Sequence, residues 1–343
     1  MNRLDGADSM KLLHVPPRRP TRGAKHIAGV GPEGIGGIVT VVNVDRSWTS
    51  LRRPGIGLPF FDDPPGPFGA AIGSSARASG PAWLIDAWWL SELSRLVYRK
   101  GIGDVEAPDL GPTRAQILAG HSWAERCVLA VDGITGAVVE AGDLATIIVF
   151  RGTQALGNWI SNLDARIGPG PRGGRVHAGF AAALRQMSGD LAAAIAGTPR
   201  PLLVTGHSLG GALATLAAVE FGADALWSFG APRVGDAVFG RTLGSTCITR
   251  VVNGNDPVTA VPPPGFPWRF RHTGRPFLLH EGEVLRPRRA GSGAAARALF
   301  ASLVERGQGG LTPFGEAPSA LADHSPINYS RHLAWCLEGS PGA

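Results

Sequence analysis

The 343-residue sequence has little of what disulfide-linked, metal-binding or membrane-spanning proteins need. Its three cysteines, Cys127, Cys247 and Cys336, lie far apart and match no zinc-binding spacing, so we expect small apolar side chains rather than disulfides or metal ligands. Glycines and polar residues interrupt the longest apolar stretch, at residues 201–218, which argues against a transmembrane helix. The composition therefore predicts a sizeable globular core that holds no metal ion.

The sequence has slightly fewer acidic than basic residues, and almost all of the basic residues are arginines. Lysine and arginine total 33 against 27 aspartates and glutamates, a net charge of +6. The excess is spread along the chain with only short clusters, such as residues 286–289, so we expect a solvated basic surface and no nucleic-acid partner. The N-terminus also lacks the continuous apolar segment of a secretion signal, which favours the cytoplasm as the default location.

The chain divides by composition near residue 80. Residues 1–80 are rich in glycine, proline and arginine, and we expect an irregular N-terminal extension with a short strand-like run at 38–44. Residues 81–343 are expected to form one folded domain that begins with a helix. Within it, residues 282–322 break the regular pattern and predict an insertion with one amphipathic helix near 292–306.

Short apolar runs alternate with helical patterns through the middle of the chain. We expect strands at 127–131, 144–150, 201–205, 225–230 and 247–253, and helices at 180–197 and 209–222, each of the two helices ending at glycine. Alternation of this kind is typical of an α/β fold. It predicts a mostly parallel central sheet with helices on both faces.

One serine stands in a setting that favours nucleophilic catalysis. The letters GHSLG at residues 206–210 fit the pattern G-x-S-x-G, with a strand-like run before them and a helix-forming run after them. A tight turn there would lift the Ser208 hydroxyl above the sheet edge, beside the amides that begin a helix. A serine needs a base to take its proton. His207 is adjacent but poorly placed, because consecutive side chains leave a sharp turn in different directions.

The remaining catalytic groups are sought after the serine, because this fold places the acid and then the histidine downstream. Asp256 follows a strand-like run in a loop closed by proline, which suits a carboxylate that orients an imidazole. Asp224 and Asp236 are the alternatives. Asp224, however, precedes a strand, and Asp236 stands at the start of an expected helix, where a carboxylate has a structural explanation.

Several histidines follow Asp256, and their local settings differ. His324 lies in a loop just before the last helix, from which it could reach the serine, and we favour it as the base. His272 is the weaker alternative; like His280, it lies in a segment that reads as a hairpin or extended chain. His332 lies further on.

Six motifs in order resemble the class 3 lipases, the family of fungal triacylglycerol lipases and their bacterial and plant relatives. They are VFRGTQALGNWISNLDA (149–165), VHAGF (176–180), VTGHSLGGALATLAA (204–218), FGAPRVGD (229–236), RVVNGNDPVTAVPP (250–263) and DHSPINY (323–329). They span roughly residues 83 to 338. The resemblance implies the α/β-hydrolase fold with Ser208, Asp256 and His324 as its triad.

The resemblance also implies roles that the residues alone do not indicate. Thr153 and the backbone amide of Leu209 would bind the oxyanion, and residues 154–174 would form a lid over the site. The apolar lid residues would be Leu156, Trp159, Ile160 and Leu163. An ordinary surface helix is the alternative for this segment, since amphipathic helices are common.

Together these features predict a serine carboxylester hydrolase, most specifically a lipase that cleaves acylglycerol esters through an acyl-enzyme and needs no cofactor. Its expected partners are a lipid or ester substrate and, transiently, a lipid–water interface. A phospholipase or a short-chain esterase is the alternative within enzymes, and an inactive hydrolase-fold binding protein is the alternative outside them. Three features depart from the fungal members: the extension, the lack of a recognisable secretion signal, and the insertion. By analogy to those members, secretion is the alternative to the cytoplasm.

Overall fold

A computed structural model describes much of the chain, in two compact units. It describes residues 24–27, 39–42, 44–47, 50–51, 54–55, 59–69, 71–72, 81–99, 111–153, 166–264, 269–274, 276–280, 282–285 and 319–338. The first unit ends at Asn43, and the second runs from Val44 to Ala343. In the first unit, strands β1 (Ala24–Ile27) and β2 (Val39–Val42) pair antiparallel, so the strand-like run noted in the sequence does form a strand.

An eight-stranded sheet organises the second unit, in the order β12-β11-β10-β9-β8-β5-β4-β3. Its strands are β3 (Ala124–Val131), β4 (Ile134–Ala141), β5 (Ala145–Phe150), β8 (Leu202–His207), β9 (Ala225–Phe229), β10 (Cys247–Asn253), β11 (Pro276–His280) and β12 (Glu283–Leu285). The five strands from β5 to β11 are parallel, and the strands at the two ends pair antiparallel. The mostly parallel sheet predicted from the sequence is confirmed.

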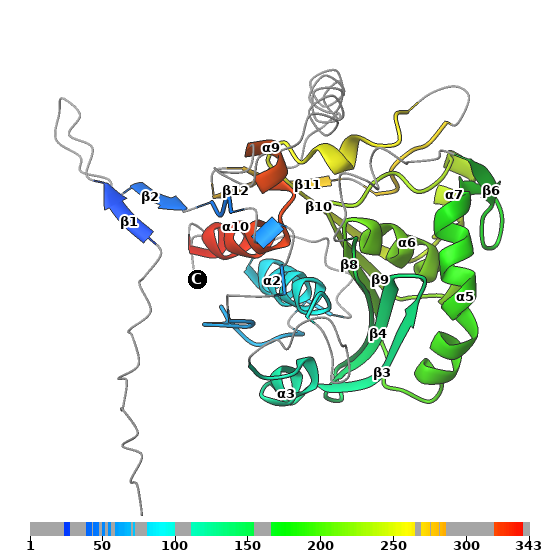
Figure 1. Cartoon of the computed structure of the whole chain (residues 1–343), viewed down its shortest axis with the longest axis horizontal. Coiled ribbons are helices and arrows are strands. Elements are labelled where there is room, and N and C mark those ends of the chain that lie inside the picture. Colours follow the sequence, from blue (N-terminus) through cyan, green and yellow to red (C-terminus); the bar gives the residue numbers. More distant parts are fainter. Residues whose placement is uncertain are drawn as a thin grey trace, which may run out of the picture. The chain divides into compact units, whose positions relative to one another are not determined.

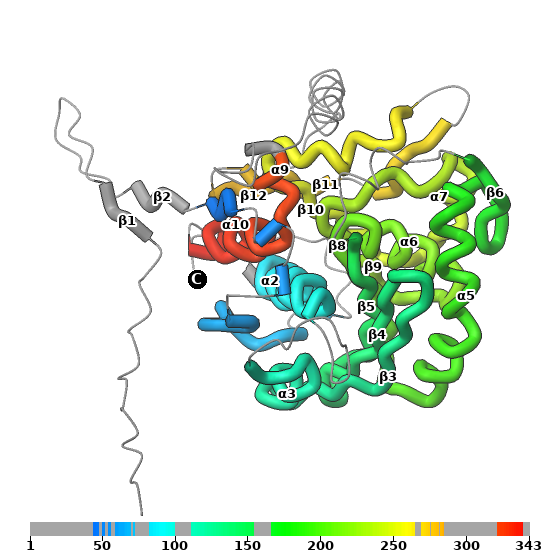
Figure 2. The backbone as a smooth tube through the Cα atoms, in the orientation of Figure 1, coloured from blue at the N-terminus to red at the C-terminus, as the bar shows by residue number. Residues whose placement is uncertain are grey.

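Helices cover both faces of this sheet (Figure 1). Helices α2 (Pro81–Leu96) and α10 (Pro326–Glu338) lie on one face, and α5 (Ala178–Ile195) and α6 (Leu209–Phe221) on the other. Figure 2 shows β5, β8 and β9 running together between these layers. Because the central strands are buried on both faces, they are continuous apolar runs in the sequence rather than alternating ones.

Shorter elements complete the described part of the second unit. They are α3 (Arg114–Ala119), α7 (Ala237–Thr242), α9 (Ser319–Asp323), the 3-10 helix η1 (Pro257–Ala260), and the small antiparallel pair β6 (Ile167–Pro169) and β7 (Arg175–His177). No helix in the described ranges is both long enough and apolar enough to cross a membrane. The helix expected near 292–306 lies outside the described residues.

The hairpin of β3 and β4 is the clearest element that the sequence reasoning missed. Asp132 and Gly133 join the two strands, with φ angles of 50° and 78°. Positive φ at both central residues makes a turn whose twist matches that of the flanking strands, and Asp-Gly is a preferred pair for it. The Asp-Gly dipeptide is therefore the feature of the sequence from which this hairpin could have been predicted.

Residues 59–69 are irregular, as their composition suggested, but their three phenylalanines, Phe60, Phe61 and Phe68, are buried in the core. Phe61 stacks on Trp89 with ring centroids 5.1 Å apart, and Phe68 lies edge-on to Trp123 at 4.9 Å. The Phe61 N–H also donates to the buried Glu92 carboxylate at 2.9 Å. The second unit, which runs from Val44, includes this stretch, and an aromatic contact and a hydrogen bond to a buried acid join it to α2.

Candidate active site

Ser208 lies at a sharp turn between β8 and α6. Its backbone has φ 58° and ψ −127°, a conformation that costs a non-glycine residue about 1–3 kcal/mol. The Ser208 N–H donates to the Phe229 carbonyl of the neighbouring strand at 2.9 Å, and the Gly211 N–H donates to the Ser208 carbonyl at 3.0 Å. Bonds to both the sheet and the helix thus hold the strained residue in place.

Two glycines make this turn sterically possible. A Cβ on Gly206 would lie 2.8 Å from the Gly211 nitrogen. A Cβ on Gly210 would overlap the carbonyl of Phe150 and lie 2.7 Å from its carbon. The start of α6 therefore packs directly on the backbone of β5, and only residues without a side chain fit there.

His324 brings a base to the serine from the loop between α9 and α10. Its Nε2 is 3.0 Å from Ser208 Oγ, and its Nδ1 is 2.9 Å from each carboxylate oxygen of Asp256. A carboxylate only accepts hydrogen bonds, so Nδ1 carries the proton and Nε2 accepts from the serine hydroxyl. The structure thus brings together the three residues that the sequence nominated as nucleophile, base and acid.

Asp256 is held by donors from three directions. It lies in the loop after β10, where its Oδ1 accepts the Val258 N–H at 2.9 Å, in addition to the bond from His324. Its Oδ2 accepts the Tyr329 hydroxyl at 2.6 Å. Burial, together with the nearby Asp256 charge, raises the pKa of Tyr329 well above 10, so the phenol stays protonated and donates. These bonds compensate a carboxylate that is only 3% exposed.

His207 does not act on its neighbour Ser208 but supports the backbone of His324. The His207 Nε2–H donates to the His324 carbonyl at 2.8 Å, and its Nδ1 accepts the Tyr98 hydroxyl at 3.1 Å. Burial, and then the proximity of His324, lowers the pKa of His207 well below 6.5. A neutral imidazole with its proton on Nε2 satisfies both bonds.

The alternative acids have structural hydrogen bonds of their own. Asp236 caps α7 by accepting the Phe239 N–H at 2.8 Å. Asp224 accepts the Leu202 N–H at 2.7 Å, at the start of β8. Both positions agree with the structural explanations that the sequence favoured for them.

The alternative bases also lie in structural positions. The His272 Nε2 donates to the Thr259 carbonyl at 2.7 Å. His280 ends β11, and His332 contacts the side chain of Asn253.

Thr153 and Leu209 border the serine from two sides. Strands β5 and β8 are parallel neighbours with Phe150 opposite Gly206, so Thr153 follows the same sheet edge as Ser208. A Cβ on Gly152 would lie 3.1 Å from the Ser208 Cβ, which shows how closely this turn approaches. Leu209 begins α6, where backbone N–H groups have no partner within the helix. The oxyanion assignment of these two residues stays a prediction that this placement favours.

The expected lid residues Leu156, Trp159, Ile160 and Leu163 lie outside the described residues, and their role stays a prediction. In the ranges that are described, no group of three histidine, cysteine, aspartate or glutamate side chains is arranged to hold a metal ion.

Tyr329 and Tyr98 are the site residues that sequence reasoning missed. Tyr329 is five residues after His324 in the motif DHSPINY, and a helical turn separates them. That spacing was the only signal for Tyr329. Nothing in the sequence around Tyr98 links it to a histidine more than a hundred positions away.

Comparisons with known proteins agree with this geometry. Residues 147–266 match the family model described as Lipase (class 3). The chain is 36% identical over 156 residues to the "Secreted mono- and diacylglycerol lipase 1" of Fusarium solani, covering 40% of this chain and 45% of that protein. It is 33% identical over 157 residues to "Phospholipase A(1) DAD1, chloroplastic" of Arabidopsis thaliana, covering 36% of this chain and 35% of that one. The alignments thus span less than half of these relatives.

A solved structure gives the same picture of the fold. The lipase from Rhizopus microsporus var. chinensis superposes with a TM-score of 0.51 at 22% identity, over 66% of this chain and 83% of that one. At this identity the likeness speaks for the fold alone.

Proposed function

We propose that this chain belongs to the class 3 lipase family, whose model matches residues 147–266, and that it is a serine carboxylester hydrolase, most specifically a lipase that cleaves acylglycerol esters. The observation that carries this proposal is the continuous relay from Asp256 through His324 to Ser208, with each link at 2.9 to 3.0 Å. A serine hydroxyl becomes a nucleophile only beside a base that is itself oriented, and the relay supplies both.

The reaction would proceed in two matched halves. Ser208 Oγ attacks the ester carbonyl while His324 Nε2 takes its proton, and a tetrahedral oxyanion forms. His324 then returns the proton to the leaving alcohol, which leaves an acyl group on Ser208. Water, deprotonated by the same imidazole, attacks the acyl-enzyme; the bond to Ser208 Oγ breaks, His324 gives the proton to Oγ, and the fatty acid leaves. Asp256 keeps the imidazole ring of His324 in its orientation and stabilises the charged form of that ring in both steps.

The oxyanion would be stabilised by the turn after β5 and by the start of α6. The Thr153 side chain and the Leu209 N–H are the proposed donors. The partial positive charge at the start of α6 would stabilise the oxyanion as well. Charge on the carbonyl oxygen develops only as the tetrahedral state forms, so such donors lower the barrier selectively. Losing one is expected to cost about 3–4 kcal/mol of barrier.

Substrate access would require movement. Ser208 and His324 are each only 1% exposed, so an ester cannot reach them in the arrangement described. We assign this movement to the segment that includes Trp159, which would open at a lipid surface. Trp159→Ala is expected to change the ratio of activity on emulsified to dissolved esters. An unchanged ratio would remove the lid role and leave the hydrolase proposal intact.

A phospholipase activity is the second candidate, because the Arabidopsis relative bears that name. A short-chain esterase would share the same relay and differ only in acyl pocket. An inactive binding protein is disfavoured, since such a protein has no need to keep the serine, histidine and aspartate in hydrogen-bonding register.

The test is active-site labelling followed by a substrate panel. A fluorophosphonate is expected to label the wild-type chain and Ser188→Ala, a matched serine substitution on α5, but not Ser208→Ala. Equal labelling of Ser208→Ala would refute the proposal. Turnover of p-nitrophenyl esters of increasing length, a triglyceride and a phospholipid would then separate lipase, esterase and phospholipase.

We further propose that the protein is exported, because the Fusarium relative is named a secreted lipase. The full chain, tagged in its native host, is expected in the culture medium. Retention of the tagged chain inside the cells would favour the cytoplasmic alternative.

A further inference from the structure

Arg250, in the middle of β10, is a buried cation for which the described residues provide no hydrogen-bond or ion-pair partner. Its side chain is 8% exposed, and its Nε has no hydrogen-bond partner. Within the described ranges no hydrogen bond reaches its two other guanidinium nitrogens, and, unlike Nε, they are not fully enclosed. Burial, and then the charge of Arg233, lowers the pKa of Arg250 to about 10, so the group remains charged at neutral pH. An unpaired charge at such depth is strongly unfavourable unless something compensates it.

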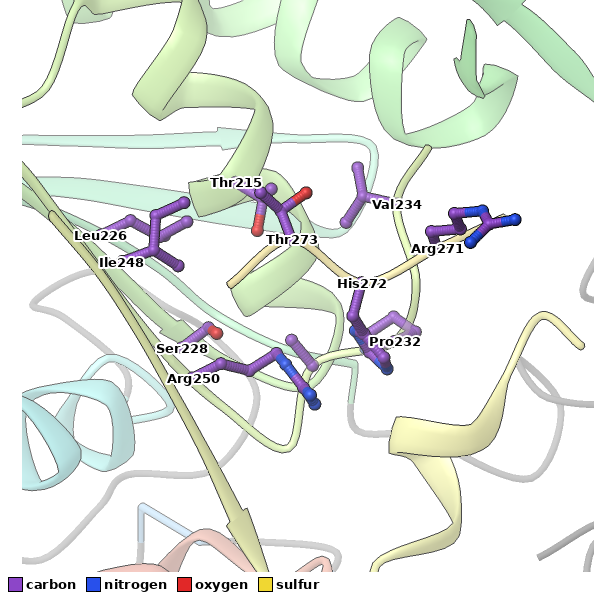
Figure 3. Close-up of a pocket in the computed structure, with 11 residues that line it drawn as sticks. Thr215, Leu226, Ser228, Pro232, Val234, Ile248, Arg250, Arg271, His272 and Thr273 are labelled. Atoms are coloured by element: carbon purple, nitrogen blue, oxygen red, sulfur yellow. The ribbon is translucent and has the colours of Figure 1, made fainter. Parts of the chain in front are cut away.

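A second unsatisfied donor lies directly opposite. Ser228 on β9 is the register partner of Arg250, so the two side chains emerge on the same face of adjacent strands. Ser228 is 2% exposed, and its hydroxyl makes no hydrogen bond in the part of the chain that the structure describes. In Figure 3 the two residues lie side by side, and Arg250 extends toward Pro232 and His272.

The surroundings of these two donors are positive. No aspartate or glutamate is among the described residues that line the pocket, whereas two arginines, Arg250 and Arg271, are. Arg233, next to the lining residue Pro232, is held by the carbonyls of Ala260 and Pro262 and adds its charge. Burial, and after it the charges of Arg250 and Arg233, lowers the pKa of His272 well below 6.5. The potential at this place therefore favours an anion.

The walls restrict what can enter. Apolar and small side chains surround the donors, with exposures of 2% to 8% for Leu226, Ala231, Val234 and Thr215. The cavity volume is about 10 Å³, which is room for a single particle of about the size of a water molecule. A lipid headgroup with its tail, or a peptide carboxylate, does not fit such a space.

We propose that Arg250 and Ser228 bind a small inorganic anion, with chloride as the representative ligand, in this pocket on the α6 face of the sheet. The guanidinium and the hydroxyl donate to it, and it balances the charge that the fold otherwise leaves buried. A water molecule would satisfy the donors but not the charge. The site is separate from the catalytic relay, and it stands whether or not the proposed hydrolase activity is correct.

Thermal unfolding in two salts tests this directly. The full chain is dialysed free of chloride into sodium gluconate, whose anion is too large for the pocket, and sodium chloride then replaces gluconate at constant ionic strength. Tm is expected to rise and saturate, by on the order of 2–5 °C. Arg250→Met is expected to lose the rise, and Arg241→Met, which removes an exposed positive charge from α7, is expected to keep it.

Two further measurements keep the proposal testable if Arg250→Met does not fold. Ser228→Ala removes one donor and is expected to shift the chloride midpoint several-fold upward. Crystals of the wild-type chain soaked in sodium bromide are expected to show an anomalous peak between Arg250 and Ser228. Equal Tm in the two salts, an equal response of Arg250→Met and Arg241→Met, or a bromide-free pocket would each overturn the proposal.

Discussion

Replacing a helical glycine by alanine should have opposite effects in the two helices that cover one face of the sheet. Gly189, in the interior of α5, has nothing within 4 Å of where a Cβ would be. Alanine there is expected to raise the free energy of unfolding by about 1 kcal/mol, because it is the better helix former. At Gly210, in the first turn of α6, the new Cβ would overlap the carbonyl of Phe150.

The size of the loss at Gly210 follows from what the Cβ meets. The obstructing atoms are backbone, with the Phe150 carbonyl carbon at 2.7 Å and the Arg151 carbonyl carbon at 3.0 Å, and β5 is held between β4 and β8. No flexible side chain can move aside. Overpacking of this kind costs about 1–3 kcal/mol, and the rigid strand puts Gly210→Ala near the upper value, so it more than cancels any gain in helix propensity.

Urea unfolding with linear extrapolation measures both variants against the wild type. Gly210→Ala should also lower kcat on a soluble ester, because the pushed strand leads into the turn that carries Thr153. Gly189→Ala should leave kcat unchanged. If Gly210→Ala were as stable as Gly189→Ala, the close packing of the helix start on β5 would not be what determines the residue at this position.

Three further outcomes are expected. Ser208→Ala and His324→Ala should each reduce kcat by about 10⁶-fold, whereas His207→Ala keeps measurable turnover; equal losses in esterase assays would make His207 part of the chemistry. Tyr329→Phe removes a buried donor to the Asp256 carboxylate and should lower the free energy of unfolding by about 1.5–3 kcal/mol in urea titrations; no loss would show that the bond is dispensable. His207 and His272 have pKa values lowered in the fold, chiefly by burial, so the unfolded chain binds protons more readily. Their stabilisation is complete above about pH 6.5 and is lost as pH falls, at up to about 1.4 kcal/mol per pH unit each; His272→Gln should flatten this slope, and an unchanged slope would contradict the assignment.

Local patterns explain why much of the site could be found in advance. The glycines around Ser208 are required by contacts within a few residues of the serine and by one adjacent strand, so the short motif carries the information. The loop setting of Asp256 and the helix that follows His324 are likewise local. The order of nucleophile, acid and base along the chain then restricted the choice to a few candidates.

Non-local packing explains what was missed. Phe61 and Phe68 lie in a stretch whose glycines and prolines suggest irregular chain, and only the tryptophans of other segments give them a core position. Tyr98, just after the end of α2, bonds to His207 at the end of β8, and no spacing rule connects the two. The Asp-Gly turn between β3 and β4 was a local signal that the apolar pattern around it obscured.

By itself, the sequence determined the strand–turn–helix at Ser208, the alternating α/β plan and the residue types of the proposed triad, because these depend on neighbours along the chain. Only the tertiary structure decided which histidine faces the serine, that Tyr329 supports Asp256, and that Arg250 lies buried beside Ser228. Each of these depends on the order of strands in the sheet and on which helix covers which face. Residues far apart in sequence come together in these places, and local sequence preferences do not predict such contacts.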